Sequence, residues 1–103
     1  MSAKDWFASD RSAMLDLDVF GEEHHIDGKK TVIVIDRDAL LERQKKEFDG
    51  IYVADMLYYV KSEKLSRRAK VDGAQTVDGV LYIIVDIREE DGITEVLLKR
   101  NGA

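Results

Sequence analysis

His24 and His25 are the only histidines in the sequence, so any metal site that uses imidazole has to be built on them. They are adjacent, and neighbouring side chains on a β-strand point to opposite faces of the sheet. Two ligands that diverge in this way do not hold one metal ion from a single regular strand. We therefore expect one exposed and one half-buried histidine in an edge hairpin, with a metal site shared between subunits as the alternative.

Other patterns that could support catalysis are absent or incomplete. The run from Glu89 to Gly92 lacks the alternating carboxylates and the distal glutamate of a calcium loop, so we expect a solvated hairpin tip. The sequence has no cysteine, which excludes thiol nucleophiles and thiolate metal sites. Its seven glycines form no G-x-G or G-x-x-x-x-G-K pattern for phosphate binding. The sequence therefore predicts a protein that is not an enzyme and holds no cofactor or metal.

Charge is distributed unevenly along the chain. The formal net charge is −5, which disfavours nonspecific binding to nucleic acid. Residues 1–27 contain seven acidic and two basic residues, whereas residues 61–70 contain five basic residues and one acidic residue. The basic run is either a solvated loop or a docking surface for an acidic partner, which includes the acidic region of an identical neighbour. DNA contact is a third alternative.

Aromatic residues lie before this basic run in the sequence. We expect them to pack in the core or between subunits, rather than to form a stacking platform for bases. The candidate interface with neighbouring subunits or partner proteins combines them with the cations of the run: Phe48, Tyr52, Tyr58, Tyr59, Lys61, Lys64, Arg67, Arg68 and Lys70.

Two helical segments are expected in a single domain of residues 1–103. Ser2 can cap a helix over residues 3–18, and Val19 and Phe20 are expected to pack as the chain leaves it. Residues 38–48 consist of good helix formers with only a weak apolar stripe, so they are predicted to form a short helix, with a mobile loop as the alternative.

The remaining sequence is typical of short antiparallel strands. Asp-Gly pairs at residues 27–28, 78–79 and 91–92 are strong hairpin turn signals. The long strand from Val80 to about Arg88 is expected to place Leu81, Ile83, Val85 and Ile87 on the core face.

The predicted fold is mainly β within the α+β class. It is a small antiparallel β-barrel or rolled sheet of five to seven strands over residues 21–100, with an N-terminal helix over residues 1–20 that covers an open end. No apolar run approaches the roughly 20 residues of a membrane span, so a cytosolic protein is expected.

The order of these elements resembles the C-terminal half of phage head–tail joining proteins. In that family a strand and a glycine turn precede a V-x-G-x-x-Y-x-V segment, a second glycine turn and an apolar closing strand. Tyr82 follows Gly79 as in the family, but Val85 lies three residues after Tyr82 instead of two, and Ile84 fills the expected position. The matching positions are Gly73, Val77, Gly79, Tyr82, Val85, Gly92, Leu97 and Leu98. The segment "DVFGEEHHIDGKKTVIVID" resembles the entry into the family's first hairpin.

The resemblance covers residues 17–100 and points to the group found in PBSX-like prophages, which is related in fold to the tail-attachment protein of phage lambda. It implies a head completion or tail attachment protein of the connector. Such a protein forms a ring, which we expect to be hexameric, between a portal or adaptor protein and the tail proteins. DNA is passing cargo, no membrane is involved, and the protein moves from the cytoplasm of the bacterial host to the virion neck. A tail terminator or other neck ring protein, or a small host β-barrel binding module, is the alternative.

Overall fold

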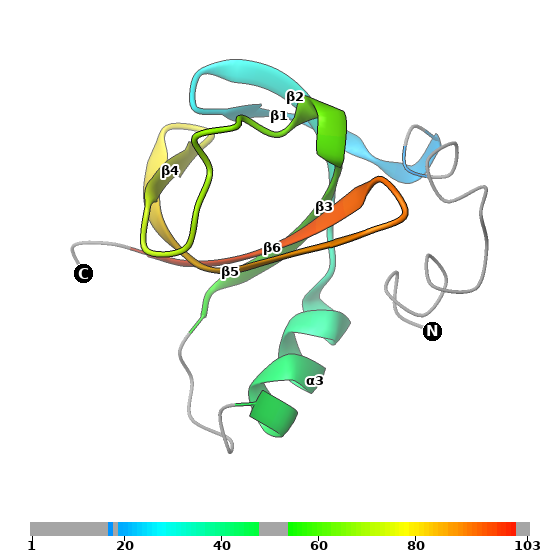
Figure 1. The fold of residues 1–103 in the computed structure, drawn as a ribbon, viewed down its shortest axis with the longest axis vertical. Helices are drawn as coiled ribbons and strands as arrows, with labels where there is room; N and C mark the ends of the chain where they lie inside the picture. The colour runs from blue at the N-terminus through cyan, green and yellow to red at the C-terminus, as the bar shows by residue number, and fades with distance from the viewer. Residues whose placement is uncertain (1–16, 18, 48–53, 101–103) are drawn as a thin grey trace.

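Six antiparallel strands form a closed barrel in the computed structural model, which describes residues 17, 19–47 and 54–100 (Figure 1). The strands are β1 (Glu22–Ile26), β2 (Lys29–Ile35), β3 (Met56–Lys61), β4 (Ala74–Val77), β5 (Val80–Glu90) and β6 (Ile93–Arg100). Around the barrel they follow the order β1-β2-β3-β6-β5-β4. The prediction of a mainly β, antiparallel barrel is confirmed.

Asp-Gly turns join three of the neighbouring strand pairs. In each pair both residues have positive φ angles, as a type I′ turn requires: 53° and 82° at residues 27–28, 51° and 83° at residues 78–79, and 51° and 81° at residues 91–92. Asparagine, aspartate and glycine tolerate this backbone region best, which explains why the same dipeptide recurs. All three predicted hairpin turns are confirmed.

The barrel interior is filled by apolar side chains from all six strands. Alternation along β3 illustrates the arrangement, because Tyr58 and Val60 point inward whereas Leu57 and Tyr59 point outward. The inner cluster contains Ile26, Ile33, Tyr58, Val60, Val77, Tyr82, Ile84, Val96 and Leu98.

A second apolar cluster lies between the outer face of the barrel and helix α3 (Arg37–Glu47), which Figure 1 shows outside the ring of strands. It contains Leu17, Ala39, Leu40, Ala54, Leu57, Tyr59, Ile93 and Leu97. The helix begins after Asp36, whose side-chain oxygen accepts a hydrogen bond from the backbone N–H of Ala39 at 3.1 Å, as an N-cap does. The sequence allowed a helix or a loop here, and the structure shows a helix.

A β-bulge interrupts the pairing of β5 with β6. Ile84 pairs with Leu98, whereas Asp86 pairs with Leu97, so Val85 is an extra residue on β5. The bulge shifts the alternation of side chains by one residue along the rest of the strand.

The face of β5 that points into the barrel therefore differs from the one we predicted. Before the bulge Tyr82 and Ile84 point inward, and after it Ile87 packs against the same inner cluster. Leu81 is 42% exposed, and Val85 packs against the outer cluster. The prediction that Leu81, Ile83, Val85 and Ile87 share one core face is wrong.

The predicted N-terminal helix over residues 3–18 lies almost wholly outside the described residues. Leu17, Val19 and Phe20 are helical. Leu17 is buried in the outer cluster, but Val19 is 72% exposed and Phe20 is 63% exposed. The expectation that Val19 and Phe20 pack as the chain leaves the helix is therefore wrong for Val19, whereas Phe20 keeps part of its side chain covered.

Candidate interaction site

The basic run lies in a long connection from β3 to β4, and hydrogen bonds hold both of its ends. At the first end, helix η1 (Ser62–Lys64) begins where the Ser62 N–H donates to the carbonyl of Gly92 at 2.8 Å. At the second end, the Asp72 N–H donates to the carbonyl of Ile84, and the Ile84 N–H donates to the carbonyl of Gly73, both at 2.8 Å. The connection is thus fixed to β5 and to the β5–β6 hairpin.

Between these anchors the connection buries apolar side chains and exposes its cations. Leu65 and Ala69 pack against the inner cluster. Lys61 is half-buried, whereas four further cations are exposed: Lys64, Arg67, Arg68 and Lys70. A solvated loop and a docking surface both fit this exposure, and the anchoring fixes where the charges are presented.

The aromatic half of the predicted interface is not displayed in the same way. Tyr58 and Tyr59 are buried in the inner and outer clusters, so they are core residues of the folded chain. The Tyr58 hydroxyl donates to Oε1 of buried Gln75 at 2.6 Å, and burial raises the pKa of Tyr58 well above its usual range. Phe48 and Tyr52 lie outside the described residues.

Two Asp-Gly turns close the barrel between β1 and β4, where the strands share only the pair Ile26 and Val77. The Asp27 N–H donates to the Thr76 carbonyl at 2.9 Å, and an Asp27 side-chain oxygen accepts from the Thr76 N–H at 2.9 Å. Asp78 makes the same two contacts with His25, at 2.8 Å and 2.9 Å. Each turn therefore binds the strand that precedes the other turn.

The histidines belong to this seam. His24 Nδ1 lies 2.6 Å from Asp78 Oδ2, and His24 Nε2 lies 3.8 Å from Glu22 Oε2. His24 is half-buried and His25 is exposed, as the sequence predicted. The predicted edge position of their hairpin is wrong, because β1 also pairs with β4 in the closed barrel. Across residues 17, 19–47 and 54–100, no group of three or more His, Cys, Asp or Glu side chains is placed to hold a metal ion.

Replacing Asp78 with asparagine should weaken the fold at neutral pH and have little effect in acid. The side-chain bond from His24, followed by the backbone bond from His25, lowers the pKa of Asp78. A lowered pKa stabilises the fold above the unfolded-state value of about 4, and this stabilisation is lost as the pH falls through the folded-state value. Urea unfolding of both proteins at neutral pH and below about pH 3 measures the difference.

The matched control is Asp91→Asn, in the β5–β6 turn. Asp91 has the same φ of 51° as Asp78, and the turn lies away from the seam. Asparagine is tolerated in this backbone region, so both variants keep their turn. A larger loss for Asp91→Asn than for Asp78→Asn would contradict the role we assign to the seam.

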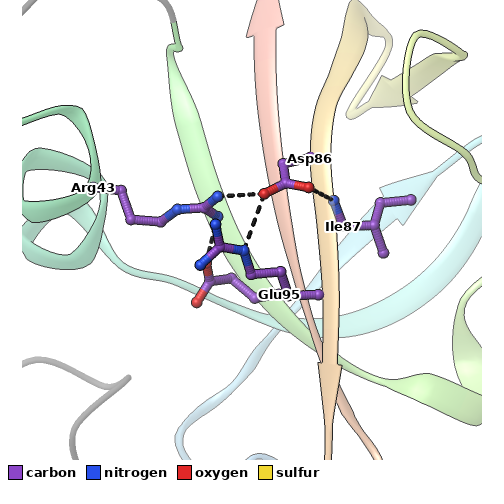
Figure 2. Close-up of polar contacts among 5 residues, drawn as sticks. Arg43, Asp86, Ile87 and Glu95 are labelled. Atoms are coloured by element: carbon purple, nitrogen blue, oxygen red, sulfur yellow. Dashed lines mark hydrogen bonds and ion pairs between the residues drawn. The ribbon is translucent and has the colours of Figure 1, made fainter. Parts of the chain in front are cut away.

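A second polar cluster fixes α3 on the barrel (Figure 2). Arg43, which is only 3% exposed, donates from Nη1 to Glu95 Oε1 and from Nη2 to Asp86 Oδ2, each at 2.5 Å. Asp86 also accepts from Arg88 Nε at 3.1 Å and from the Ile87 N–H at 2.9 Å. One guanidinium of α3 thus bridges carboxylates of β5 and β6.

The electrostatics of this cluster are set by opposing effects on Asp86. Burial, the largest effect, raises the pKa of the carboxyl, but the hydrogen bond and charge of Arg43 and smaller contributions outweigh it, so the net pKa is lowered. The cluster joins α3 to the barrel, and the cation that its carboxylates bind is the guanidinium of Arg43.

The sequence analysis missed both polar clusters. The Asp-Gly pairs predict turns, but nothing in the segments 26–28 and 77–79 predicts that these two turns contact each other's strands. Helix α3 contains two arginines, Arg37 and Arg43, and the sequence gives no sign that Arg43 is the buried one. Acids on otherwise apolar strands, Asp86 and Glu95, were the available signal for its partners.

Comparison with known proteins supports a fold and no more. No family model matches the sequence, and no curated protein matches it. A solved structure described as the ATP-binding sugar transporter-like protein from Salmonella typhimurium is similar, with a TM-score of 0.53 and 18% sequence identity. The similarity covers 95% of this chain and 96% of that chain. At this identity the likeness shows a shared fold, and the name of that protein describes that protein alone.

No helix among the described residues is both long enough and apolar enough to cross a membrane.

Proposed function

We propose that this protein is a structural component of a phage or prophage neck, where it closes the DNA-filled head and presents the surface that the tail binds. Its partners would be a portal or adaptor protein and tail proteins, and copies would join in a ring, for which the family resemblance implies six subunits. It would be made in the cytoplasm of the bacterial host and then become part of the virion neck. The order of strands and glycine turns that resembles head–tail joining proteins supports this role.

The observation that carries the proposal is the construction of the connection between β3 and β4. Its ends are hydrogen-bonded to the barrel, Leu65 and Ala69 pack inward, and its outer positions are cationic. A flexible basic tail loses conformational freedom when it binds, whereas an anchored loop presents its charges already ordered. Such a loop suits a fixed contact with an acidic protein surface.

The test is complementation of a phage or induced prophage that lacks this gene. We expect particles without the protein to show, by electron microscopy, filled heads separate from tails, or heads that have lost their DNA. The wild-type gene should restore joined particles. The triple variant K64E/R67E/R68E should fold but fail to restore joining, because it reverses the exposed charges of the loop.

The control variant K29E/K30E reverses two exposed lysines at the β1–β2 turn and should restore joining. Joined particles in the absence of the gene, or full restoration by the triple variant, would contradict the proposal. A pull-down then separates the head-joining role from a tail terminator. Retention of the portal or adaptor protein supports the first, and retention of the tail tube alone supports the second.

A further inference from the structure

An apolar strip runs along the outer face of β5 and continues beyond the part covered by the outer cluster. Val85 packs against that cluster, Ile83 is half-buried, and Leu81 is 42% exposed. The strand register places Ala74 across from Ile83 and Thr76 across from Leu81 on β4. The outer surface of the β4–β5 hairpin therefore exposes apolar side chains to solvent.

Two exposed lysines lie near this strip, and exposed Asp72 and Asp78 also belong to the segments around it. Exposed Lys99 pairs with Ile83 on β6, so it stands beside the strip. The bond from the Asp72 N–H to the Ile84 carbonyl holds the preceding residues beside β5, and among them Val71 is 48% exposed and Lys70 is exposed. We call this surface the hairpin patch: Lys70, Val71, Leu81, Ile83 and Lys99.

A second exposed apolar group stands before β1 and has the opposite charge. Val19 and Phe20 are the two most exposed large apolar residues of the described chain, and exposed Glu22 and Glu23 follow them. We call this surface the entry patch: Val19, Phe20, Glu22 and Glu23.

The entry patch is held in place by Gly21. The Gly21 N–H donates to the Leu17 carbonyl at 2.7 Å. A Cβ atom at Gly21 would lie 2.5 Å from that same carbonyl oxygen and 2.5 Å from a Val32 methyl group, so the chain runs tightly against β2 here. Val19 and Phe20 thus directly precede a point at which the backbone is held against β2.

The two patches lie on opposite sides of the barrel. In Figure 1 the segment before β1 is at the right, and β4 with the start of β5 is at the left. Within one chain the segment before β1 and the start of β5 therefore do not meet, although the Glu22 side chain approaches the β4–β5 turn through His24. We propose that the entry patch of one copy packs on the hairpin patch of a second copy, with apolar contacts and paired opposite charges.

This contact joins two different surfaces, so it propagates head to tail and closes into a ring where the rotation permits. The apolar residues would supply most of the affinity, since single exposed ion pairs contribute only about 0–1 kcal/mol. The charges would set which way the copies face. The inference deepens the self-association in the proposed function, and its test is separate from head–tail joining.

Disulfide cross-linking tests the contact directly, because the chain has no cysteine of its own. Two variants, F20C and L81C, are prepared, and one carries a small tag so that the dimer species separate on a gel. Each variant alone and an equal mixture of the two are then oxidised at high protein concentration. We expect the mixed sample to form a heterodimer several-fold more than either variant forms a homodimer. The variant E42C, at an exposed position on α3, mixed with L81C sets the background.

A charge test accompanies the cross-linking. Adding K70E and K99E to the L81C chain should lower the heterodimer yield several-fold, because it places acids opposite Glu22 and Glu23. Heterodimer no higher than the E42C background, or L81C homodimer as abundant as the heterodimer, would overturn the proposed contact. Circular dichroism of each variant confirms that it is folded before the yields are compared.

The two proposals fail in different ways. If cross-linking stays at background while particles still need the protein to join, the contact is wrong and the neck function stands. If the heterodimer forms but particles join without the gene, the contact stands and the neck function is wrong.

Discussion

Replacing Arg43 with methionine should lower the free energy of unfolding by about 3–5 kcal/mol, the range found when one partner of a buried ion pair is removed. The guanidinium is almost fully buried and lies 2.5 Å from both Glu95 and Asp86. Methionine keeps much of the side-chain volume but leaves the carboxylates without their cation. The estimate rests on the buried Glu95 pair, since the Asp86 side chain is 32% exposed and water screens it. Urea unfolding at neutral pH measures the loss.

The pH dependence of this loss identifies its cause. In the wild type the lowered pKa of Asp86 stabilises the fold above about pH 4, and that contribution is lost as the pH falls through the folded-state pKa. The variant loses the hydrogen bond and charge of Arg43, so the pKa of the same carboxyl rises relative to the wild type, and protonation relieves the unpaired charge as the pH falls. The stability difference between the two proteins should therefore be largest at neutral pH and should narrow in acid.

Arg37→Met is the matched control, because Arg37 is an exposed arginine on the same helix. It should change stability by no more than about 0.5 kcal/mol. Adding Glu95→Gln to Arg43→Met should recover part of the loss, since it removes a buried charge that has no cation. A loss of similar size for both arginine variants, or one that does not change with pH, would show that the ion pairs do not hold the helix.

These ion pairs explain how a helix with few apolar residues stays on the barrel. Ala39 and Leu40 are the α3 residues of the outer cluster, and Leu41 is 56% exposed. Burial of one alanine and one leucine contributes only a few kcal/mol, and apolar contact alone does not fix how the helix is turned. The fork of Arg43, which reaches two strands at once, fixes that orientation.

The sequence could predict those parts of the fold that depend on short-range rules. The three Asp-Gly turns each follow from two adjacent residues that tolerate positive φ, and a barrel follows from several short strands joined by such turns. The polar clusters could not be predicted in the same way. His24 meets Asp78 across 54 residues, and Arg43 meets Asp86 across 43 residues, so only the closed barrel brings them together.

For the residues of the candidate interface, the exposure of the cations was predictable, whereas the burial of Tyr58 and Tyr59 in the core was not. Exposure of Lys64, Arg67, Arg68 and Lys70 follows from the cost of burying an unpaired charge. Tyr58 and Tyr59 lie in a strand with apolar residues on both faces. Composition alone does not distinguish a strand whose two faces are both buried within the chain from a strand with one face buried against another subunit. In the folded chain Tyr58 is buried in the barrel interior and Tyr59 in the cluster beneath α3, and this burial depends on tertiary contacts that composition does not show.

The inward face of β5 was mispredicted for a physical reason. Residues 80–85 are apolar at every position, so alternation of polarity cannot tell which set faces the core. The bulge at Val85 then shifts the alternation of inward and outward side chains by one residue. Asp86 therefore lies on the outer face, where it contacts Arg43, and Ile87 lies on the inner face. A single extra residue thus serves both the barrel core and the docking of the helix.

Aspartate in place of Ile84 should abolish folding, whereas aspartate in place of Leu81 should be tolerated. Ile84 is fully buried inside the barrel. Its loss removes about 2–5 kcal/mol of apolar packing, and an unpaired buried carboxylate adds several kcal/mol more. That total is comparable with the whole stability of a small domain, about 5–15 kcal/mol. The barrel signal in circular dichroism and the cooperative urea transition should both disappear.

Leu81→Asp is a matched control because it places the same charge three residues away on the same strand. The side chain of Leu81 is on the outer face and 42% exposed, so its carboxylate stays in water and the loss should be about 1 kcal/mol or less. The face predicted from the sequence alone requires the opposite order, with Leu81→Asp unfolded and Ile84→Asp folded. The two variants therefore decide which set of alternating β5 side chains points into the barrel. A strand shifted by one residue would exchange every inward side chain for an outward one. Leu81→Asp can also be combined with I83C and tested for disulfide cross-linking to F20C. If this double variant folds but cross-links less than I83C alone, Leu81 contributes to the contact made by the hairpin patch.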